Sequence, residues 1–297
     1  MKNKVIQLIK DRKNGLKDDR KLGLIIQGGG LRTSFAGGVM VGLEELGFAD
    51  VFDCVYGISA GSCCGAYLLS HQTRLGTSIF FEDLPGKKFI QPWKPYRMFN
   101  LDYLCDDLMK NTKRLDVGKV LSAKTELKIF ITEAKTGILT QFSKNDAGED
   151  LLHLIKAACS YPGTYFPLVK INGKGYLDGG AVKALPIAEA IEEGYTDLLV
   201  VATVPKSYKR KASSWSFLVF TVLFIPLLGV NMMKRLITRL KNYNRHSSEI
   251  FEHQELHPEV NISVISPDYY VNSVETRAQV LKELAEHGEA VTRRAFR

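Results

Sequence analysis

Patterns for metal ions and disulfide bonds are missing from this sequence of 297 residues. Its five cysteines are an odd number, include no CxxC pair and show no metal-ligand spacing with histidine. A structural zinc site or a disulfide framework is therefore not expected, and unpaired thiols favour a reducing compartment. No acidic cluster has the spacing of a calcium-binding loop, so we expect neither a metal ion nor any other cofactor.

Long apolar segments are also missing. Residues 1–21 are polar and lack the apolar core and cleavage site of a secretory signal, which predicts a cytoplasmic protein. The most apolar segment, residues 215–230, is shorter than the ~20 residues that span a bilayer as a helix, and Pro226 interrupts it. Basic residues flank it on both sides. Two interpretations stay open, a buried or lid helix and a segment lying in the membrane surface.

The composition is not that of a disordered or repetitive chain. Hydrophobic residues make up 45% and charged residues 24%, as in globular proteins with a sizeable core. Because there is no internal repeat or low-complexity linker, we expect a single domain over residues 1–297. The formal net charge of +8 favours an anionic partner, but it does not distinguish nucleic acid from an anionic membrane surface.

Two strand–turn–helix units stand near the start of the chain. An apolar run over 22–27 leads through three glycines into a helical pattern over 33–46. A second run over 51–56 leads through a Gly-Ile-Ser-Ala-Gly turn into a helix that reaches about residue 71. Repeated units of this kind predict a parallel sheet with helices on its faces. Further strands are expected at 127–133, 138–142, 176–178 and 197–204, and further helices at 103–111, 150–159 and 186–193.

The turn Gly57-Ile58-Ser59-Ala60-Gly61 fits the nucleophile-elbow pattern G-x-S-x-G. In such an elbow a sharp turn between strand and helix pushes the serine hydroxyl into solvent. Gly57 and Gly61 avoid Cβ clashes where the two elements pass closely, and the helix N-terminus favours negative charge beside Ser59. A tight turn without chemistry is the alternative, which five residues alone do not exclude.

Gly28, Gly29 and Gly30 also join a strand to a helix. Three consecutive glycines let backbone amides point into a cavity, which suits an oxyanion or a phosphate. The alternative is a dinucleotide-binding loop, with Asp53 on the ribose, although Thr33 replaces the third glycine of that fingerprint. This interpretation leaves the elbow unexplained. A P-loop is excluded because no Gly-Lys-Ser/Thr follows.

Asp178 ends a short predicted strand and is followed by Gly179 and Gly180. A carboxylate in this position can approach another loop closely, although a plain Asp-Gly turn explains the same residues. None of the six histidines has the local signature of a catalytic triad, so a Ser–His–Asp arrangement is open but unsupported. A dyad of Ser59 and Asp178 accounts for the three glycine-marked strand ends together.

Three motifs, in this order, resemble those of the patatin-like phospholipase family. They are Gly28-Gly-Gly-Leu-Arg32, Gly57-Ile-Ser-Ala-Gly61 and Asp178-Gly-Gly180. The segments Glu133-Ala-Lys-Thr-Gly137 and Ala157-Ala-Cys-Ser-Tyr-Pro162 also resemble parts of that family, so the resemblance covers about residues 22–204. It implies an α/β fold, a three-layer α/β/α sandwich with a mainly parallel central sheet. It also implies a Ser–Asp dyad and hydrolysis of lipid acyl esters.

The resemblance implies a role for each motif residue. The expected site residues are the nucleophile Ser59, its base Asp178, the oxyanion-hole amides of Gly28, Gly29 and Gly30, the elbow glycines Gly57 and Gly61, and Arg32 as support of the loop or contact to an anionic head group. Residues 22–204 would form the catalytic core and 205–297 a C-terminal extension. Thr33 stands where the family usually has glycine, and we expect it to cap the following helix.

The implied partners are lipid acyl esters, such as phospholipid or lysophospholipid, and a membrane surface that the protein contacts peripherally from the cytoplasm. No nucleic acid is expected. Two other hypotheses stay open. One is a non-catalytic lipid- or membrane-binding protein that retains the fold. The other is an oxidoreductase that binds a nucleotide at the glycine-rich loop.

Overall fold

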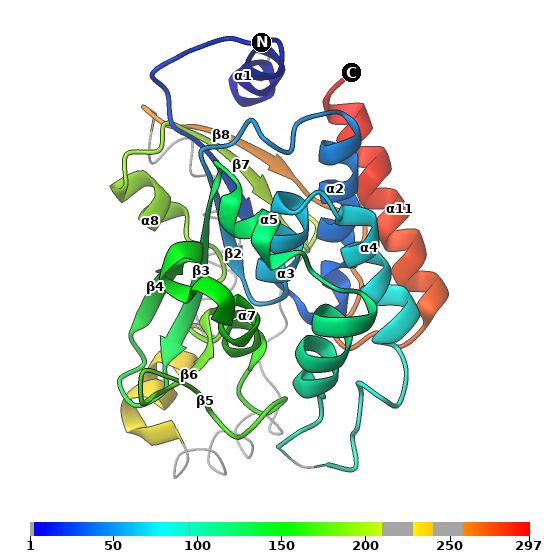
Figure 1. Cartoon of the computed structure of the whole chain (residues 1–297), viewed down its shortest axis with the longest axis vertical. Helices are drawn as coiled ribbons and strands as arrows, with labels where there is room; N and C mark the ends of the chain where they lie inside the picture. The colour runs from blue at the N-terminus through cyan, green and yellow to red at the C-terminus, as the bar shows by residue number, and fades with distance from the viewer. Residues whose placement is uncertain (1–2, 95, 210–227, 240–257) are drawn as a thin grey trace.

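The computed structural model describes residues 3–94, 96–209, 228–239 and 258–297. A single sheet runs through the middle of these residues (Figure 1). Its strands are β1 (Leu22–Ile26), β2 (Cys54–Ile58), β3 (Glu126–Glu133), β4 (Leu139–Ser143), β5 (Val169–Ile171), β6 (Lys174–Asp178), β7 (Asp197–Val201) and β8 (Asn261–Ile265). Their order is β5-β6-β3-β2-β1-β7-β8, and β4 pairs with β3 off this path. The central strands β3, β2, β1, β7 and β8 are parallel, whereas β4, β5 and β6 pair antiparallel.

Helices lie on both faces of this sheet (Figure 1). The α-helices are α1 (Lys4–Lys13), α2 (Ser34–Glu45), α3 (Ala60–Leu69), α4 (Thr73–Ser78), α5 (Val117–Ser122), α6 (Lys144–Ala147), α7 (Leu151–Cys159), α8 (Ile187–Glu192) and α11 (Ala278–Ala295), and residues 228–239 are also helical. Two π-helices, η2 (Ile79–Asp83) and η3 (Tyr103–Thr112), and three 3-10 turns, η1 (Gly30–Thr33), η4 (Gly148–Asp150) and η5 (Gly179–Ala181), complete the described elements.

The sheet is buried on both sides, which explains its near-continuous apolar strands. Along β1, Leu24 and Ile26 pack with the large helices on one face, while Ile25 points into the cluster around α8 on the other. Every residue of β1, β2 and β7 is buried. Strands covered on both faces read as apolar runs rather than as alternating patterns. The predicted three-layer α/β/α sandwich is therefore confirmed.

The expected strands and helices of residues 22–204 are present, with shifted ends. The second strand covers Cys54–Ile58 and not 51–56, so it runs directly into the elbow. The helix expected over 103–111 is a π-helix, Tyr103–Thr112. Residues 215–227 of the apolar segment lie outside the described residues, and 228–230 begin the helix that continues to 239. Within the described ranges, no helix combines the length and apolar character needed to cross a bilayer.

The last part of the chain adds a strand to the same sheet and a helix to the same core, two elements that the sequence analysis did not predict. Strand β8 pairs in parallel with β7, and α11 packs on α2. The two helices approach through glycines: a Cβ on Gly38 would lie 1.9 Å from the Ala285 carbonyl oxygen, and one on Gly288 would lie 2.2 Å from the Phe35 carbonyl oxygen. Both distances are far below van der Waals contact, so any side chain at these positions would separate the helices.

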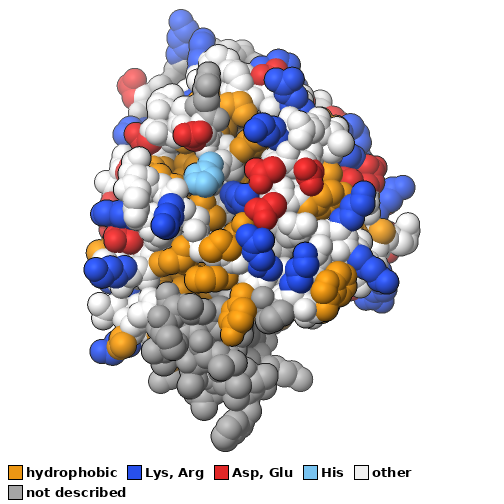
Figure 2. Space-filling view, turned by 60° about the horizontal axis from the view of Figure 1, so that its bottom comes forward, with side chains coloured by type: hydrophobic (Ala, Val, Ile, Leu, Met, Phe, Trp, Pro, Cys, Tyr) orange, Lys and Arg blue, Asp and Glu red, His pale blue; other side chains and the backbone are white. Residues whose placement is uncertain are grey.

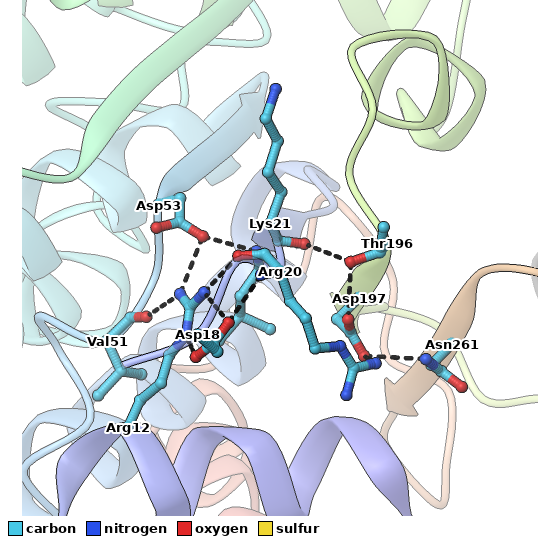
Figure 3. Close-up of polar contacts among 10 residues, drawn as sticks. Arg12, Asp18, Arg20, Lys21, Val51, Asp53, Thr196, Asp197 and Asn261 are labelled. Atoms are coloured by element: carbon cyan, nitrogen blue, oxygen red, sulfur yellow. Dashed lines mark hydrogen bonds and ion pairs between the residues drawn. The ribbon is translucent and has the colours of Figure 1, made fainter. Parts of the chain in front are cut away.

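A charged network fixes the amino ends of the central strands (Figure 3). Arg12 reaches up from α1 and binds Asp18 through both carboxylate oxygens, each at 3.0 Å. It also donates to Asp53 at 2.8 Å and to the Val51 carbonyl at 2.9 Å. Asp53 in turn accepts the Leu22 amide of β1 at 2.7 Å. One guanidinium thus connects α1, the loop before β1 and the start of β2.

We predict that Arg12→Ala lowers the free energy of unfolding by about 1–3 kcal/mol, because the Arg12 side chain is only 11% exposed and its loss removes its hydrogen bonds to the largely shielded Asp18 carboxylate, to Asp53 and to the Val51 carbonyl. Urea denaturation would measure the change. Lys17→Ala, in the exposed loop after α1, removes the same charge and serves as control. Equal stabilities of the two variants would show that the network contributes nothing.

Candidate active site

Ser59 stands on a strained turn between β2 and α3. Its φ of 55° and ψ of −136° lie outside the regions that residues with a side chain normally adopt, a conformation that costs about 1–3 kcal/mol. The flanking glycines permit this turn. A Cβ on Gly57 would lie 2.6 Å from the Ser62 Cα, and one on Gly61 would lie 2.4 Å from the Ile26 carbonyl oxygen. The elbow geometry expected from G-x-S-x-G is present.

The Gly28–Gly30 loop lies against Ser59. Because β1 and β2 are parallel neighbours, both loops leave the sheet at the same edge. A Cβ on Gly28 would lie 2.5 Å from the Ser59 Cβ, so only glycine allows this approach. Among the described residues, no acceptor binds the amides of Gly28, Gly29 or Gly30. These donors therefore remain for a ligand.

Two side chains outside the glycine motif fix this loop. Gln27 accepts the Thr203 amide at 2.8 Å, and the Thr203 hydroxyl donates to the Gly28 carbonyl at 2.7 Å. Thr203 follows β7, the strand on the other side of β1. The loop is thus held from β7 on one side while it contacts the elbow on the other.

Asp178 reaches the same place from an antiparallel strand. It ends β6 opposite Ile131 of β3, and its carboxylate accepts the Gly180 amide at 2.6 Å. The carboxylate is 1% exposed. Burial raises the pKa of Asp178 to about 6, while hydrogen bonds from the Ser59 hydroxyl and the Gly180 amide and the charge of Arg239 act in the opposite direction. The Ser59 hydroxyl is thus near enough to lower the pKa of Asp178, and both residues line the same cavity.

A cavity of about 430 Å³ opens over these groups. Its polar end holds Gly28, Gly29, Gly30, Arg32, Ser59 and Asp178. The remainder is mostly apolar and is lined by side chains of α3, of both π-helices and of the loop between them, among them Phe80, Leu84, Phe89, Phe99, Leu104 and Met109. The cavity suits a molecule with one reactive polar end and a long apolar body.

All the predicted site residues lie at this cavity or directly beneath it. Gly57 and Gly61 pack under the elbow, and the Arg32 guanidinium lies 5.8 Å from the centre of the Tyr270 ring at the cavity.

The expectation that Thr33 caps the following helix was wrong. The 3-10 turn η1 runs without a break into α2, so Thr33 has helical dihedral angles and its buried hydroxyl caps nothing among the described residues.

Several cavity residues had no sequence signal. Arg239 arrives on the helix over 228–239, which packs through Met232 and Leu236 against Leu177, the residue before Asp178. Tyr208 and Tyr270 stack at 4.4 Å beside Arg32. These residues come from segments without a recognisable motif, and only long-range packing brings them to the site.

The alternatives raised by the sequence place their residues elsewhere. Asp53 lies at the amino end of β2 in the Arg12 network, one strand length from the glycine loop, so it cannot bind a ribose held there. The histidines in the described part of the chain are engaged away from the cavity: His71 pairs with Asp50, His153 with the Lys170 carbonyl and His287 with Asp268.

Comparison with known proteins agrees with this geometry. The family model described as "Patatin-like phospholipase" matches residues 24–191. The chain therefore belongs to the patatin-like phospholipase family, a family of lipid acyl hydrolases.

Individual relatives are more distant. The chain is 26% identical over 196 residues to the "Uncharacterized protein YjjU" of Escherichia coli (strain K12), an alignment covering 62% of this chain and 52% of that protein. It thus spans about half the length of this curated relative. Its fold is similar to that of VipD from Legionella pneumophila, with a TM-score of 0.52 and 13% identity over 93% of this chain and 67% of that chain.

We predict that Asp178→Asn stabilises the protein more at pH 8 than at pH 5. The folded-state pKa of about 6 lies above the ordinary value of 3.8, so the folded protein holds this proton more tightly than the unfolded chain. Stability from this group is therefore complete below the ordinary pKa and is lost as the pH rises through about 6. The ionised carboxylate costs roughly 3 kcal/mol at pH 8, which asparagine avoids.

Urea denaturation of both proteins at the two pH values would measure this difference. Asp107→Asn, which changes an exposed carboxylate of η3, is the control and should show no such pH dependence. A gain that is equal at pH 5 and pH 8 would contradict the proposed cost of burying the Asp178 charge.

Proposed function

We propose that the protein is a serine lipid acyl hydrolase of the phospholipase A or lysophospholipase type, with Ser59 as nucleophile and Asp178 as its base. One observation carries the proposal: a serine on a strained elbow and a buried carboxylate, whose pKa the serine hydroxyl lowers, line the polar end of the same apolar cavity. In a protein that retains the fold but has lost its activity, selection would not maintain both the strained serine and the buried charge.

The reaction follows from the positions of these groups. Asp178 accepts the Ser59 proton as the hydroxyl oxygen attacks the ester carbonyl. The amides of Gly28, Gly29 and Gly30, to which no described residue supplies an acceptor, stabilise the oxyanion of the tetrahedral intermediate. The alcohol leaves with the proton from Asp178, and the acyl group remains on Ser59. Water, deprotonated by Asp178, then attacks the acyl-enzyme and releases the fatty acid.

The pKa of Asp178 suits this role. A carboxylate with a pKa of about 6 is ionised at neutral pH yet more basic than an exposed aspartate. Burial supplies this basicity. The Ser59 hydroxyl, the Gly180 amide and, to a smaller extent, the charge of Arg239 oppose the effect of burial, so the carboxylate stays ionised at neutral pH.

The surroundings of the site favour a lipid at a membrane. The apolar lining would hold the acyl chain, and Arg32 would contact an anionic head group. The loop segments 84–94 and 96–101 and the helix over 228–239, which contribute to the cavity, lie at the lower end of Figure 1. With this end turned forward, Figure 2 shows apolar side chains gathered beside lysines and arginines. This apolar and basic surface, together with the net charge of +8, favours peripheral contact with an anionic membrane from the cytoplasm.

Labelling with a fluorophosphonate probe tests the dyad. We expect labelling of the wild type that is lost in Ser59→Ala and falls at least ~10²-fold in Asp178→Asn, because the neutral amide cannot accept the proton. Labelling of the wild type should also fall as the pH drops through about 6, where Asp178 becomes protonated.

Ser62→Ala is the matched control, since Ser62 lies one turn further along α3 and its buried hydroxyl has no partner in the described part of the chain. This variant should label like the wild type. Undiminished labelling of Asp178→Asn would refute the dyad. Absence of labelling in folded wild type that still binds lipid vesicles would favour the non-catalytic lipid-binding protein.

Tyr67 is expected to limit the length of the acyl chain. It lines the cavity two turns along α3 from Ser59, about 12 Å away by helix geometry. Its hydroxyl donates to the Lys113 carbonyl at 2.5 Å. Tyr67→Ala should raise the ratio of kcat/KM for long-chain over short-chain esters several-fold. Tyr67→Phe keeps the ring and should retain the wild-type ratio. Identical ratios in all three proteins would show that the acyl chain does not extend to Tyr67.

A further inference from the structure

Two cysteines face each other inside the cavity. The sulfur atoms of Cys63 and Cys159 lie 3.8 Å apart, and both residues line the cavity at the candidate dyad. A disulfide bond is about 2.05 Å long, so the pair is reduced here. No sequence pattern connects them, because 96 positions separate them in the chain. Neither thiol has a part in the proposed hydrolysis.

The pair connects the two halves of the candidate dyad. Cys63 lies one turn after Ser59 on α3, and Cys159 is the last residue of α7. The next residue, Ser160, accepts the Asp178 amide through its carbonyl at 3.1 Å. A covalent bond between the two sulfurs would therefore join the helix that carries the nucleophile to the segment that positions the carboxylate.

The cavity also determines which oxidant reaches the thiols. Its lining beyond the dyad is mainly apolar, so it favours a molecule with a hydrocarbon body over a small polar one. A hydroperoxide on an organic chain combines such a body with an electrophilic oxygen. The same cavity would admit it by the route that we propose for an acyl chain.

We propose that Cys63 and Cys159 form an oxidation site at which an organic hydroperoxide converts the thiol pair into a disulfide and closes the active site. The Cys63 sulfur attacks the terminal peroxide oxygen, the O–O bond breaks and the organic alcohol leaves with a proton. The Cys159 sulfur then attacks the Cys63 sulfenic acid, the S–S bond forms and water leaves. In sum, one hydroperoxide and two thiols give one alcohol, one water and one disulfide.

The order of attack follows from the surroundings of the two thiols. Cys159 is the last residue of α7, at a helix C-terminus where negative charge is disfavoured, so it is the poorer first nucleophile. Cys63 lies on the helix whose N-terminus follows Ser59, where negative charge is favoured. Cys63 is therefore the residue that the peroxide oxidises first, and Cys159 resolves it.

Closing the bond changes the site geometrically. The sulfurs must approach by roughly 1.8 Å, from 3.8 Å to the bonded distance. This movement draws the start of α3 toward Ser160 and places the disulfide directly beside Ser59 in the cavity. We expect this displacement of Ser59 relative to Asp178 to disrupt the candidate dyad and so to block acylation. This consequence for activity rests on the proposed hydrolase, whereas formation of the disulfide does not.

Thiol mapping after treatment with cumene hydroperoxide tests the proposal. We expect the reduced wild type to lose two thiols and to yield one cross-linked peptide pair, Cys63 with Cys159. Cys159→Ala should stop at a sulfenic acid on Cys63, trapped by dimedone, and Cys63→Ala should form no disulfide. Hydrogen peroxide at equal concentration should react at least several-fold more slowly, because it lacks the apolar body.

Cys105→Ala is the matched control, since Cys105 is buried in the same core cluster but does not line the cavity. This variant should cross-link like the wild type. Cross-linking of Cys63 or Cys159 to another cysteine, or no cross-link at all in the wild type, would overturn the proposal. A faster reaction with hydrogen peroxide would overturn the assigned class of oxidant. Mapping of the wild type decides these points even if a variant fails to fold.

Activity is measured separately. Fluorophosphonate labelling of Ser59 should fall at least tenfold in the oxidised wild type and return after reduction with dithiothreitol, but stay unchanged in treated Cys63→Ala. If the cross-link forms and labelling persists, the disulfide does not close the site. If reduced wild type never labels, the proposed hydrolase fails while the oxidation site stands.

Discussion

The contact between Gly28 and Ser59 is the constraint on which the rest of this structure depends. It exists because β1 and β2 are adjacent and parallel with Ile26 opposite Gly57, so that both strands release their loops at one edge. A side chain at position 28 would push the loop from the elbow. The position of the glycine amides, the strained serine and the opening of the cavity all follow from this one close approach of two backbones.

The carboxylate of the candidate dyad is positioned in a different way from the serine. Asp178 reaches the elbow on an antiparallel strand, across β3, and its carboxylate is buried where a charge is costly. The surrounding groups offset only part of that cost, which is why its pKa stays high. The protein holds a strained backbone and a poorly solvated charge side by side, and the large parallel core keeps both in place.

The sequence predicted the parts of this site that have a local cause. Strand–glycine–helix patterns marked Gly28, Ser59 and Asp178, because turns and close approaches need particular residues at fixed spacing. The buried central strands were equally visible as apolar runs. Thr33 was misjudged because a 3-10 turn precedes α2, and the hydroxyl of a residue with helical dihedral angles does not cap the helix.

Other features depend on contacts between distant segments and leave no pattern in the sequence. Three examples are the hydrogen bond from Thr203 to the glycine loop, the position of Arg239 at the cavity and the contact between Cys63 and Cys159. So is the place of β8 and α11, whose glycines and apolar residues have meaning only once α2 lies against them.

The contact between the Leu31 amide and the Ser273 carbonyl, 2.9 Å long, has a consequence for the boundaries of this protein. Leu31 directly follows the three glycines, and Ser273 precedes α11. The glycine loop, which has a clear sequence motif, is therefore bounded on one side by residues of 205–297, a region without any motif. The recognised family region ends at residue 191, but the lining of the cavity at the candidate dyad continues to Val274. Comparison of related sequences over residues 24–191 alone would therefore overlook the C-terminal residues that pack against the glycine loop. Exchange of that region between relatives would transfer the loop without the residues that contact it.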